Sequence, residues 1–248
     1  MSLTKLKFYT PARICLEKTG NSMTTRELLK LKEDLANAND AVFLSWDWQI
    51  MQKELENQEQ VYVLSSQAKS REIYLQRPDL GRILDTNSQK ILDTNKHNFD
   101  IVIIISDGLS AYAMKHVMPL YNILYQELKN KYTLAPICLV SQARVALSDD
   151  IGFRLKAKLA LMLIGERPGL SSFDSLGIYL TYNPRLFATD ADRNCISNIH
   201  PPDGLSYEDA ANKLLYLVNL IFKLKISGVN LKDNSLLGNP LRSKGSLE

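Results

Sequence analysis

The sequence predicts an α/β fold, in which a doubly wound, mainly parallel sheet follows a mostly helical N-terminal region. Two observations lead to this prediction. From Phe99 onward, short β-branched runs alternate with segments of helical periodicity, as in successive βαβ units. Before Phe99, the apolar residues recur mainly at helical spacing. With 248 residues, of which 45% are hydrophobic, the chain can bury a substantial core as one large domain or two small ones.

The N-terminal region begins with a helix signal. Thr24-x-x-Glu27 forms a capping box and leucines follow it at helical spacing, so a helix is expected from about Thr24 to Asn37. A second helix is expected over roughly Asp40 to Glu59, followed by a short strand over Val61 to Leu64.

The segment "REIYLQRPDLGRIL" predicts another short strand, a break at Pro78 and then a helix. The apolar face of that helix comprises Leu80, Ile83, Leu84, Ile91 and Leu92. The pentapeptide "ILDTN" begins at Ile83 and again at Ile91, and we interpret it as a shared helix face because the shift is about two helical turns.

Four strands are expected after this region: "DIVIIIS", "APICLVS", "LALMLIG" and "SLGIYLTY". A turn and a helix follow the first strand, with a break or kink at Pro119, and "SDDIGFRLKAK" predicts the next helix. Ser206-x-x-Asp209 caps the last helix, whose apolar stripe is formed by Ala210, Leu214, Leu217, Val218, Ile221 and Leu224.

Composition argues against several classes of protein. The formal net charge of +3 is mild and the basic residues are dispersed, so nucleic acid is not an expected partner. The cysteines Cys15, Cys138 and Cys195 are widely spaced, which suggests neither a disulfide framework nor a zinc site and fits a reducing compartment. The apolar runs fall short of the ~20 residues that span a bilayer, and no signal segment opens the chain, so a cytoplasmic protein without membrane contact is expected.

Ligands of an open parallel sheet bind beyond the carboxyl ends of its strands. Four loops are expected there: "SDGLS" (106–110), "SQARVA" (141–146), "GERPGLSS" (165–172) and "DADRNCISNIH" (190–200). Composition allows two interpretations of "GERPG". It is either a simple turn, or a loop whose glycines let the backbone approach a flat ligand while Glu166 accepts hydrogen bonds from the ligand.

Other kinds of site have weak support. A serine hydrolase that uses Ser106 or Ser110 lacks the G-x-S-x-G pattern, and "SDGLSA" is not the glycine fingerprint of a dinucleotide site. The three histidines have no metal-ligand spacing, so a metal bound directly by this chain is not expected. Cys195 is interpreted from the residues alone as a small buried hydrophobe, and the nearby Arg193 is weak evidence for a reactive thiolate.

Five motifs, in order along the chain, resemble the small subunit of ethanolamine ammonia-lyase: "YLQRPDLGR", "ISDGLSA", "LIGERPGL", "DRNCISNIHPPDG" and "KISGVNL". The resemblance extends from about Thr10 to Leu231. It implies a subunit of an adenosylcobalamin-dependent lyase that converts ethanolamine to acetaldehyde and ammonia through a radical. The cobalamin would lie between this chain and a large catalytic subunit, in a hetero-oligomer with several copies of each.

The same resemblance implies three cofactor-binding residues, Val145, Glu166 and Cys195, and no catalytic or metal-ligating residue on this chain. Val145 would lie against the corrin, Glu166 would accept hydrogen bonds from amides at its rim, and Cys195 would make a compact contact. The chain departs from the family pattern between Ile14 and Thr25 and at Gln142-Ala143, which replaces a tyrosine-glycine pair.

The implied organisation has three parts. Residues 1–97 form a mostly helical region that packs on the large subunit, and residues 98–231 form a Rossmann-like cobalamin-binding domain. Residues 232–248 form a flexible tail, whose end is typical of a cloning remnant. The implied location is the cytoplasm, within a bacterial microcompartment for ethanolamine utilisation. The alternative is a non-catalytic cobalamin-binding or assembly module of such a compartment.

Overall fold

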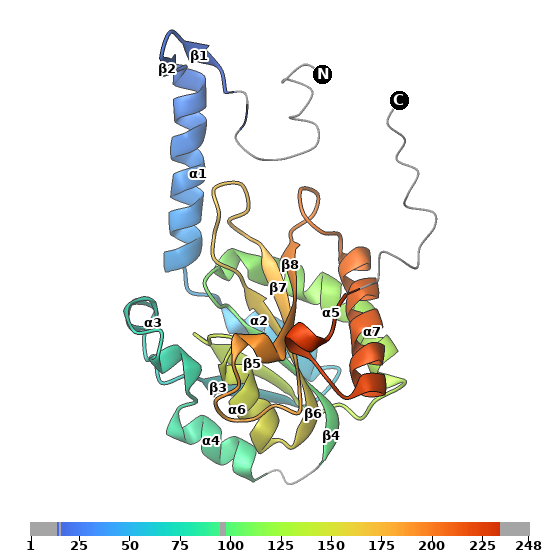
Figure 1. Ribbon diagram of the computed structural model, residues 1–248. Helices are drawn as coiled ribbons and strands as arrows, with labels where there is room; N and C mark the ends of the chain where they lie inside the picture. The colour runs from blue at the N-terminus through green and yellow to red at the C-terminus, as the bar shows by residue number, and fades with distance from the viewer. Residues whose placement is uncertain (1–13, 15, 95–97, 234–248) are drawn as a thin grey trace, which may run out of the picture.

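The computed structural model describes residues 14, 16–94 and 98–233; Cys15, His97 and most of the predicted tail lie outside them. Figure 1 shows the elements in chain order. The strands are β1 (Lys18–Thr19), β2 (Ser22–Met23), β3 (Val61–Ser65), β4 (Phe99–Ser106), β5 (Ile137–Ser141), β6 (Ala157–Gly165), β7 (Leu176–Tyr182) and β8 (Arg193–Ile199). The α-helices are α1 (Thr25–Phe43), α2 (Trp48–Glu56), α3 (Arg71–Gln76), α4 (Thr86–Asp93), α5 (Val117–Lys129), α6 (Leu147–Arg154) and α7 (Tyr207–Leu224). Short 3₁₀ helices span Leu80–Arg82, Ala111–His116, Asp190–Asp192 and Gly228–Asn230.

A six-stranded sheet in the order β3-β5-β4-β6-β7-β8 forms the centre of the molecule. The pairs from β3 to β6 are parallel, whereas β6–β7 and β7–β8 are antiparallel. The predicted α/β class and mostly parallel sheet are therefore confirmed, with two antiparallel strands that the βαβ rhythm did not indicate. β3 precedes residue 97 and forms one edge of this same sheet.

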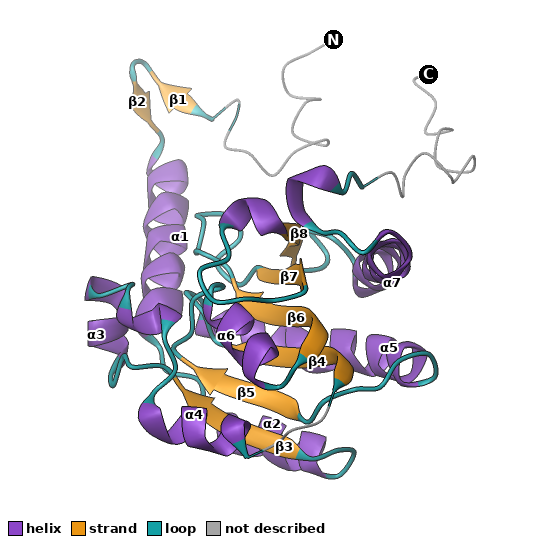
Figure 2. Cartoon of the chain, turned by 60° about the horizontal axis from the view of Figure 1, so that its bottom comes forward, coloured by secondary structure: helices purple, strands orange, loops and turns teal. Residues whose placement is uncertain are grey.

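Helices cover both faces of the sheet (Figure 2). On one face, residues of α2, α5 and α7 pack against alternate strand residues such as Ile103 and Leu161. On the other, α4 and α6 pack against Val102, Ile104 and Met162. The "DIVIIIS" run is thus buried on both sides, and its hydrophobic side chains supply both cores.

The N-terminal helices differ in their bounds from the prediction. Thr24 caps α1 by accepting from Glu27 N at 3.4 Å, as predicted, but the helix continues to Phe43. α2 starts only at Trp48, where Asp47 accepts from Gln49 N at 3.0 Å. Ala41 is the one buried residue of α1, and Figure 1 shows this helix standing away from the sheet.

The segment after β3 contradicts two predictions. "REIYLQ" forms α3, not a strand, because Ser70 caps it by accepting from Ile73 N at 3.3 Å. The predicted single helix from Leu80 to Leu92 is also wrong. Leu84 instead forms a bridge with Ser66, and α4 begins only where the Asp85 carboxylate accepts from Ser88 N at 2.7 Å.

Two further predictions concern the C-terminal half. The predicted helix after β4 is divided near Pro119 into the 3₁₀ helix Ala111–His116 and α5, and Pro119 lies in the first turn of α5, where a residue needs no amide donor. The predicted loop "DADRNCISNIH" contains β8, which pairs with β7. The last helix is confirmed: Ser206 accepts from Asp209 N at 3.1 Å, and the predicted stripe is buried except for Leu224.

Candidate functional site

Three of the four predicted loops meet at the carboxyl ends of β4, β5 and β6. Two glycines allow the loops after β4 and β6 to touch. A Cβ on Gly108, which has φ +52°, would lie 2.3 Å from the Gly165 carbonyl oxygen, and a Cβ on Gly165 would lie 2.2 Å from the Ser110 carbonyl oxygen. A side chain does not fit at either position, so glycine at both positions is what allows the two loops to pack this closely.

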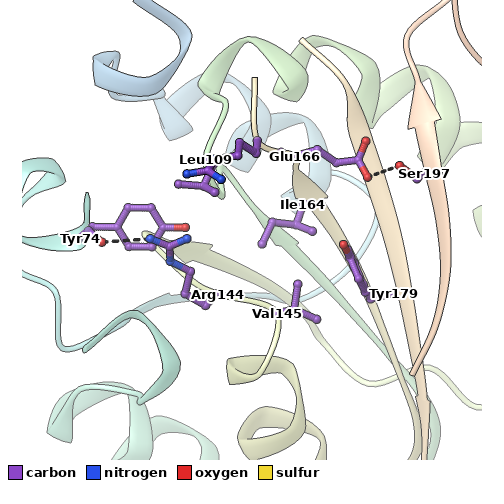
Figure 3. Close-up of a pocket in the computed structure, with 10 residues that line it drawn as sticks. Tyr74, Leu109, Arg144, Val145, Ile164, Glu166, Tyr179 and Ser197 are labelled. Atoms are coloured by element: carbon purple, nitrogen blue, oxygen red, sulfur yellow. Dashed lines mark hydrogen bonds between the residues drawn. The ribbon is translucent and has the colours of Figure 1, made fainter. Parts of the chain in front are cut away.

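Two adjoining pockets lie beside these loops, on the α6 face of the sheet. The first has a volume of about 430 Å³ and is bordered by Glu166, while the second has about 620 Å³ and is bordered by Cys195. Both are bordered by Arg144, Val145 and Tyr179, and we call the two together the groove. Figure 3 shows the first pocket, with Val145 and Glu166 on opposite sides of Ile164. The three predicted site residues thus surround one groove.

Val145 lies half-buried between β5 and α6. Its carbonyl oxygen accepts from Ser148 N at 3.0 Å and from Ser148 Oγ at 2.8 Å, which fixes it to the first turn of α6. The preceding Gln142 has φ 58° and donates its amide to Asp107 Oδ1 at 2.8 Å. The chain therefore leaves β5 through a left-handed residue at one of the positions that depart from the family pattern.

Glu166 is half-buried, and its carboxylate already accepts three hydrogen bonds from this chain. The donors are Ser175 Oγ at 2.5 Å, Ser197 Oγ at 2.5 Å and Asn198 N at 3.0 Å. The side chain passes over Gly177, where a Cβ would lie 2.9 Å from Glu166 Oε1. Glu166 therefore joins the end of β6 to β7 and β8. A carboxylate offers about four lone-pair sites, so acceptor capacity remains toward the groove.

Cys195 lies on β8 directly opposite Tyr179 on β7. The residue is exposed at the surface, but desolvation by its neighbours raises the pKa of its thiol, and the charge of Glu166 raises it further, against a lowering hydrogen bond with Tyr179. A raised pKa favours the neutral thiol, so Cys195 is suited to a soft contact and not to nucleophilic chemistry.

Arg193, which lies close to Cys195 in the sequence, is committed elsewhere. It forms a buried ion pair with Asp149 of α6 and donates to Asp190 Oδ1 at 2.7 Å and to the Ala188 carbonyl at 3.1 Å. Burial raises the pKa of Asp149, and Arg193 opposes this by stabilising the carboxylate. This pair connects α6 to β8 beside the second pocket, which Arg193 borders.

The groove contains residues that sequence reasoning missed as site residues. Tyr74, Arg144 and Tyr179 border it, and they come from α3, from the loop after β5 and from β7. The segment "YLQRPDLGR" was a sequence signal for Tyr74, but its role depended on α3 being a helix and not a strand.

The serine hydrolase alternative finds no support in the geometry. Ser106 and Ser110 are fully buried, and their hydroxyls donate to Asp107 Oδ1 at 3.3 Å and to the Phe173 carbonyl at 2.7 Å. The His200 Nε2 atom lies 2.8 Å from Asn198 Oδ1, away from either serine hydroxyl. Within the described part of the chain, no group of three His, Cys, Asp or Glu side chains is placed to hold a metal ion. Likewise, none of the described helices is long and apolar enough to cross a membrane.

Comparison with known proteins gives consistent matches over nearly the whole chain. The family model of the ethanolamine ammonia-lyase light chain (EutC) matches residues 1–232. The ethanolamine ammonia-lyase small subunit of Pseudomonas fluorescens is 47% identical over 238 residues, which cover 93% of this chain and 86% of that protein. The proteins of the same name from Pseudomonas syringae pv. tomato and Ralstonia nicotianae are 45% and 46% identical, cover 98% and 92% of this chain, and are each covered over 87% of their length.

Proposed function

Because the chain belongs to the ethanolamine ammonia-lyase small-subunit family, and is therefore one subunit of a lyase, we propose that it clamps adenosylcobalamin against a large catalytic subunit. The observation that carries this proposal is the groove, which brings Val145, Glu166 and Cys195 together from three separate stretches of chain. Its position at the carboxyl ends of β5 and β6 is where sheets of this kind bind ligands.

The lining of the groove fits a corrin, a broad apolar plate with amide arms at its rim. Leu109, Val145 and Ile164 offer apolar surface, while Glu166 and Arg144 offer an acceptor and a donor beside it. Arg144 borders the groove, and its Nε atom is buried without a hydrogen-bond partner within the described chain, so the donors of this guanidinium are not all satisfied. When bound, adenosylcobalamin supplies the radical chemistry by which ethanolamine becomes acetaldehyde and ammonia.

In this proposal, the protein residues bind and orient. Val145 lies against the corrin face, Glu166 accepts from rim amides with the acceptor capacity it has left, and Cys195 makes a compact contact beside Tyr179. The hydrogen bonds of Glu166 to β7 and β8 keep its carboxylate in place when the groove is empty. The catalytic acid and base come from the large subunit in this proposal.

The proposal extends to organisation and location. Residues 1–97 pack on the large subunit, which is supported by the apolar side chains that α1 exposes, such as Leu29 and Leu35. Residues 98–231 act as the Rossmann-like cobalamin-binding domain, to which β3 adds an edge strand and α3 adds Tyr74, in a hetero-oligomer within a bacterial microcompartment. The alternative is a non-catalytic cobalamin-binding or assembly module, which would use the same groove.

The deciding experiment is co-expression with a large subunit, followed by purification and addition of adenosylcobalamin. We expect the two chains to co-purify, to acquire a corrinoid absorption spectrum and to release ammonia from ethanolamine. A complex that stays colourless contradicts the cofactor proposal. A coloured complex without ammonia release favours the assembly module.

A further inference from the structure

Arg144 lies in the loop after β5 and borders every pocket of the candidate site described above. It borders both pockets of the groove and a third, adjoining pocket that it shares with Arg167. Its neighbour Val145 is one of the proposed cofactor contacts.

The guanidinium of Arg144 is held in a defined orientation by α3 and the segment after it. Its Cζ lies 4.4 Å from the centroid of the Tyr74 ring, and its Nη2 donates to the Tyr74 carbonyl at 3.3 Å (Figure 3). Its backbone amide donates to the Gly81 carbonyl at 2.8 Å. Tyr74 is fully buried and donates its hydroxyl to the Ala143 carbonyl at 2.9 Å, so the ring is a fixed platform.

The donors of Arg144 are only partly used. Within residues 14, 16–94 and 98–233, neither Nε nor Nη1 has a hydrogen-bond partner, and no carboxylate lies within ion-pair distance. Two other arginines near the groove differ: Arg71 is paired with Asp107, and Arg193 with Asp149. An uncompensated guanidinium beside a cavity is stabilised by a ligand that brings acceptor oxygens.

We propose that Arg144 is a further cofactor-binding residue, which donates hydrogen bonds to an acceptor oxygen of the corrinoid, and that Tyr74 and Gly81 are its positioning residues. This inference rests on the proposed function. A cobalamin offers two kinds of acceptor oxygen, the carbonyls of the corrin amides and the phosphodiester of the nucleotide arm. Both suit the planar donor edge of a guanidinium.

The test measures corrinoid binding to the assembled two-subunit complex by absorbance titration. The variants are Arg144→Met, which removes the donors, and Arg144→Lys, which keeps the charge and the stem. The ligands are cobalamin and cobinamide, a corrinoid without the nucleotide and its phosphodiester.

We expect Arg144→Met to weaken cobalamin binding by about tenfold or more. Arg144→Lys should weaken it less, because lysine keeps a charged donor but lacks the planar fork of the guanidinium. Arg77→Met is the matched control, since Arg77 is exposed and does not border the groove.

The two ligands separate the sources of the acceptor oxygen. Weaker binding of both ligands assigns Arg144 to a corrin amide carbonyl, whereas weaker binding of cobalamin alone assigns it to the phosphodiester. Unchanged affinity for both ligands overturns the proposal. If the methionine variant does not assemble, wild-type affinity in Arg144→Lys overturns it. A wild-type complex that binds neither corrinoid contradicts the proposed function instead.

The positioning residues have a separate readout. A Cβ on Gly81 would lie 2.9 Å from the Tyr74 ring and 3.0 Å from Arg144 Cγ, so Gly81→Ala displaces the stack while the guanidinium stays present. We expect Gly81→Ala to weaken cobalamin binding in the wild-type background and to have no further effect in Arg144→Met. Equal effects in both backgrounds contradict a positioning role.

Discussion

At the residue scale, Glu166 serves the fold as well as the groove. Its carboxylate accepts from Ser175, Ser197 and Asn198, which belong to the β7 and β8 side of the site. A substitution there removes an acceptor from three donors at once, and its effect on a ligand is partly indirect.

We expect Glu166→Ala to lower the free energy of unfolding of the isolated chain by about 1–3 kcal/mol, because the buried hydroxyl of Ser175 loses its acceptor. The affinity of the complex for cobalamin should fall by a similar amount, about 1–3 kcal/mol. Urea unfolding and absorbance titration measure the two effects. Glu127→Ala on the exposed face of α5 is the control and should change neither. Unchanged cobalamin affinity would leave Glu166 with a structural role alone.

Cys195 should be slow to react with alkylating agents at neutral pH. Its raised pKa means that less thiolate is present than for an unperturbed cysteine, whose pKa is about 8.5, and the rate should rise as pH approaches the raised value. Mass spectrometry of the Cys195 peptide after iodoacetamide treatment measures this, with the urea-unfolded chain as reference. Faster alkylation of Cys195 in the folded chain than in the unfolded chain at pH 7.5 contradicts the raised pKa of its thiol.

The site could be predicted only in part from the sequence. Val145, Glu166 and Cys195 came from motif resemblance, and the structure places them around one groove. Tyr179 was not foreseen because it reaches the groove through its pairing with Cys195, which depends on the register of β7 and β8. Arg144 was not predicted as a site residue, since the Tyr74 ring on which it stacks lies in a segment predicted as a strand.

At the element scale, the two copies of "ILDTN" show why local sequence did not suffice. The first copy crosses from extended chain into α4, and its Asp85 caps that helix. In the second copy, Asp93 ends the same helix and pairs with Arg154 at 2.9 Å. The same residues therefore adopt different conformations, because bridge formation by Leu84 with Ser66 decides where the helix begins.

This difference predicts unequal effects for the same substitution. Asp85→Ala should lower the free energy of unfolding by about 1 kcal/mol, as for a lost N-cap. Asp93→Ala is the matched control, and because its ion pair is largely exposed, it should cost at most a few tenths of a kcal/mol. Urea unfolding monitored by circular dichroism measures both. Equal losses would contradict the capping role of Asp85.

Three of the strands that were predicted correctly share a physical cause. β4, β5 and β6 are buried on both faces, so continuous apolar runs mark them without reference to partners. β8 has exposed polar residues, Ser197 and Asn198, and was predicted as a loop. β8 is a strand because it pairs with β7, and the local sequence does not indicate that pairing.

At the scale of the whole molecule, α1 is only loosely integrated into the fold, because Ala41 is its single buried residue. Leu29 is 61% exposed and Leu35 is 51% exposed, while the sheet and its two cores are complete without them. Such apolar exposure on a helix is typical of a surface that another protein covers.

We therefore expect Leu29→Gln combined with Leu35→Gln to reduce co-purification with the large subunit and to leave the unfolding midpoint of the isolated chain unchanged. Lys30→Gln combined with Glu33→Gln on the same helix is the control and should preserve co-purification. Pull-down from a co-expressing strain and thermal unfolding give the two readouts. Normal co-purification of the leucine variant would remove α1 from the interface.

The antiparallel strands β7 and β8 have a consequence for the energetics of binding. They turn one side of the groove into hydrogen-bonded sheet, so Tyr179 and Cys195 project from paired backbone and not from a free loop. Most of the conformational entropy that a loop-built site loses when a large ligand docks has been lost here already, at folding. More of the contact energy is then left for affinity.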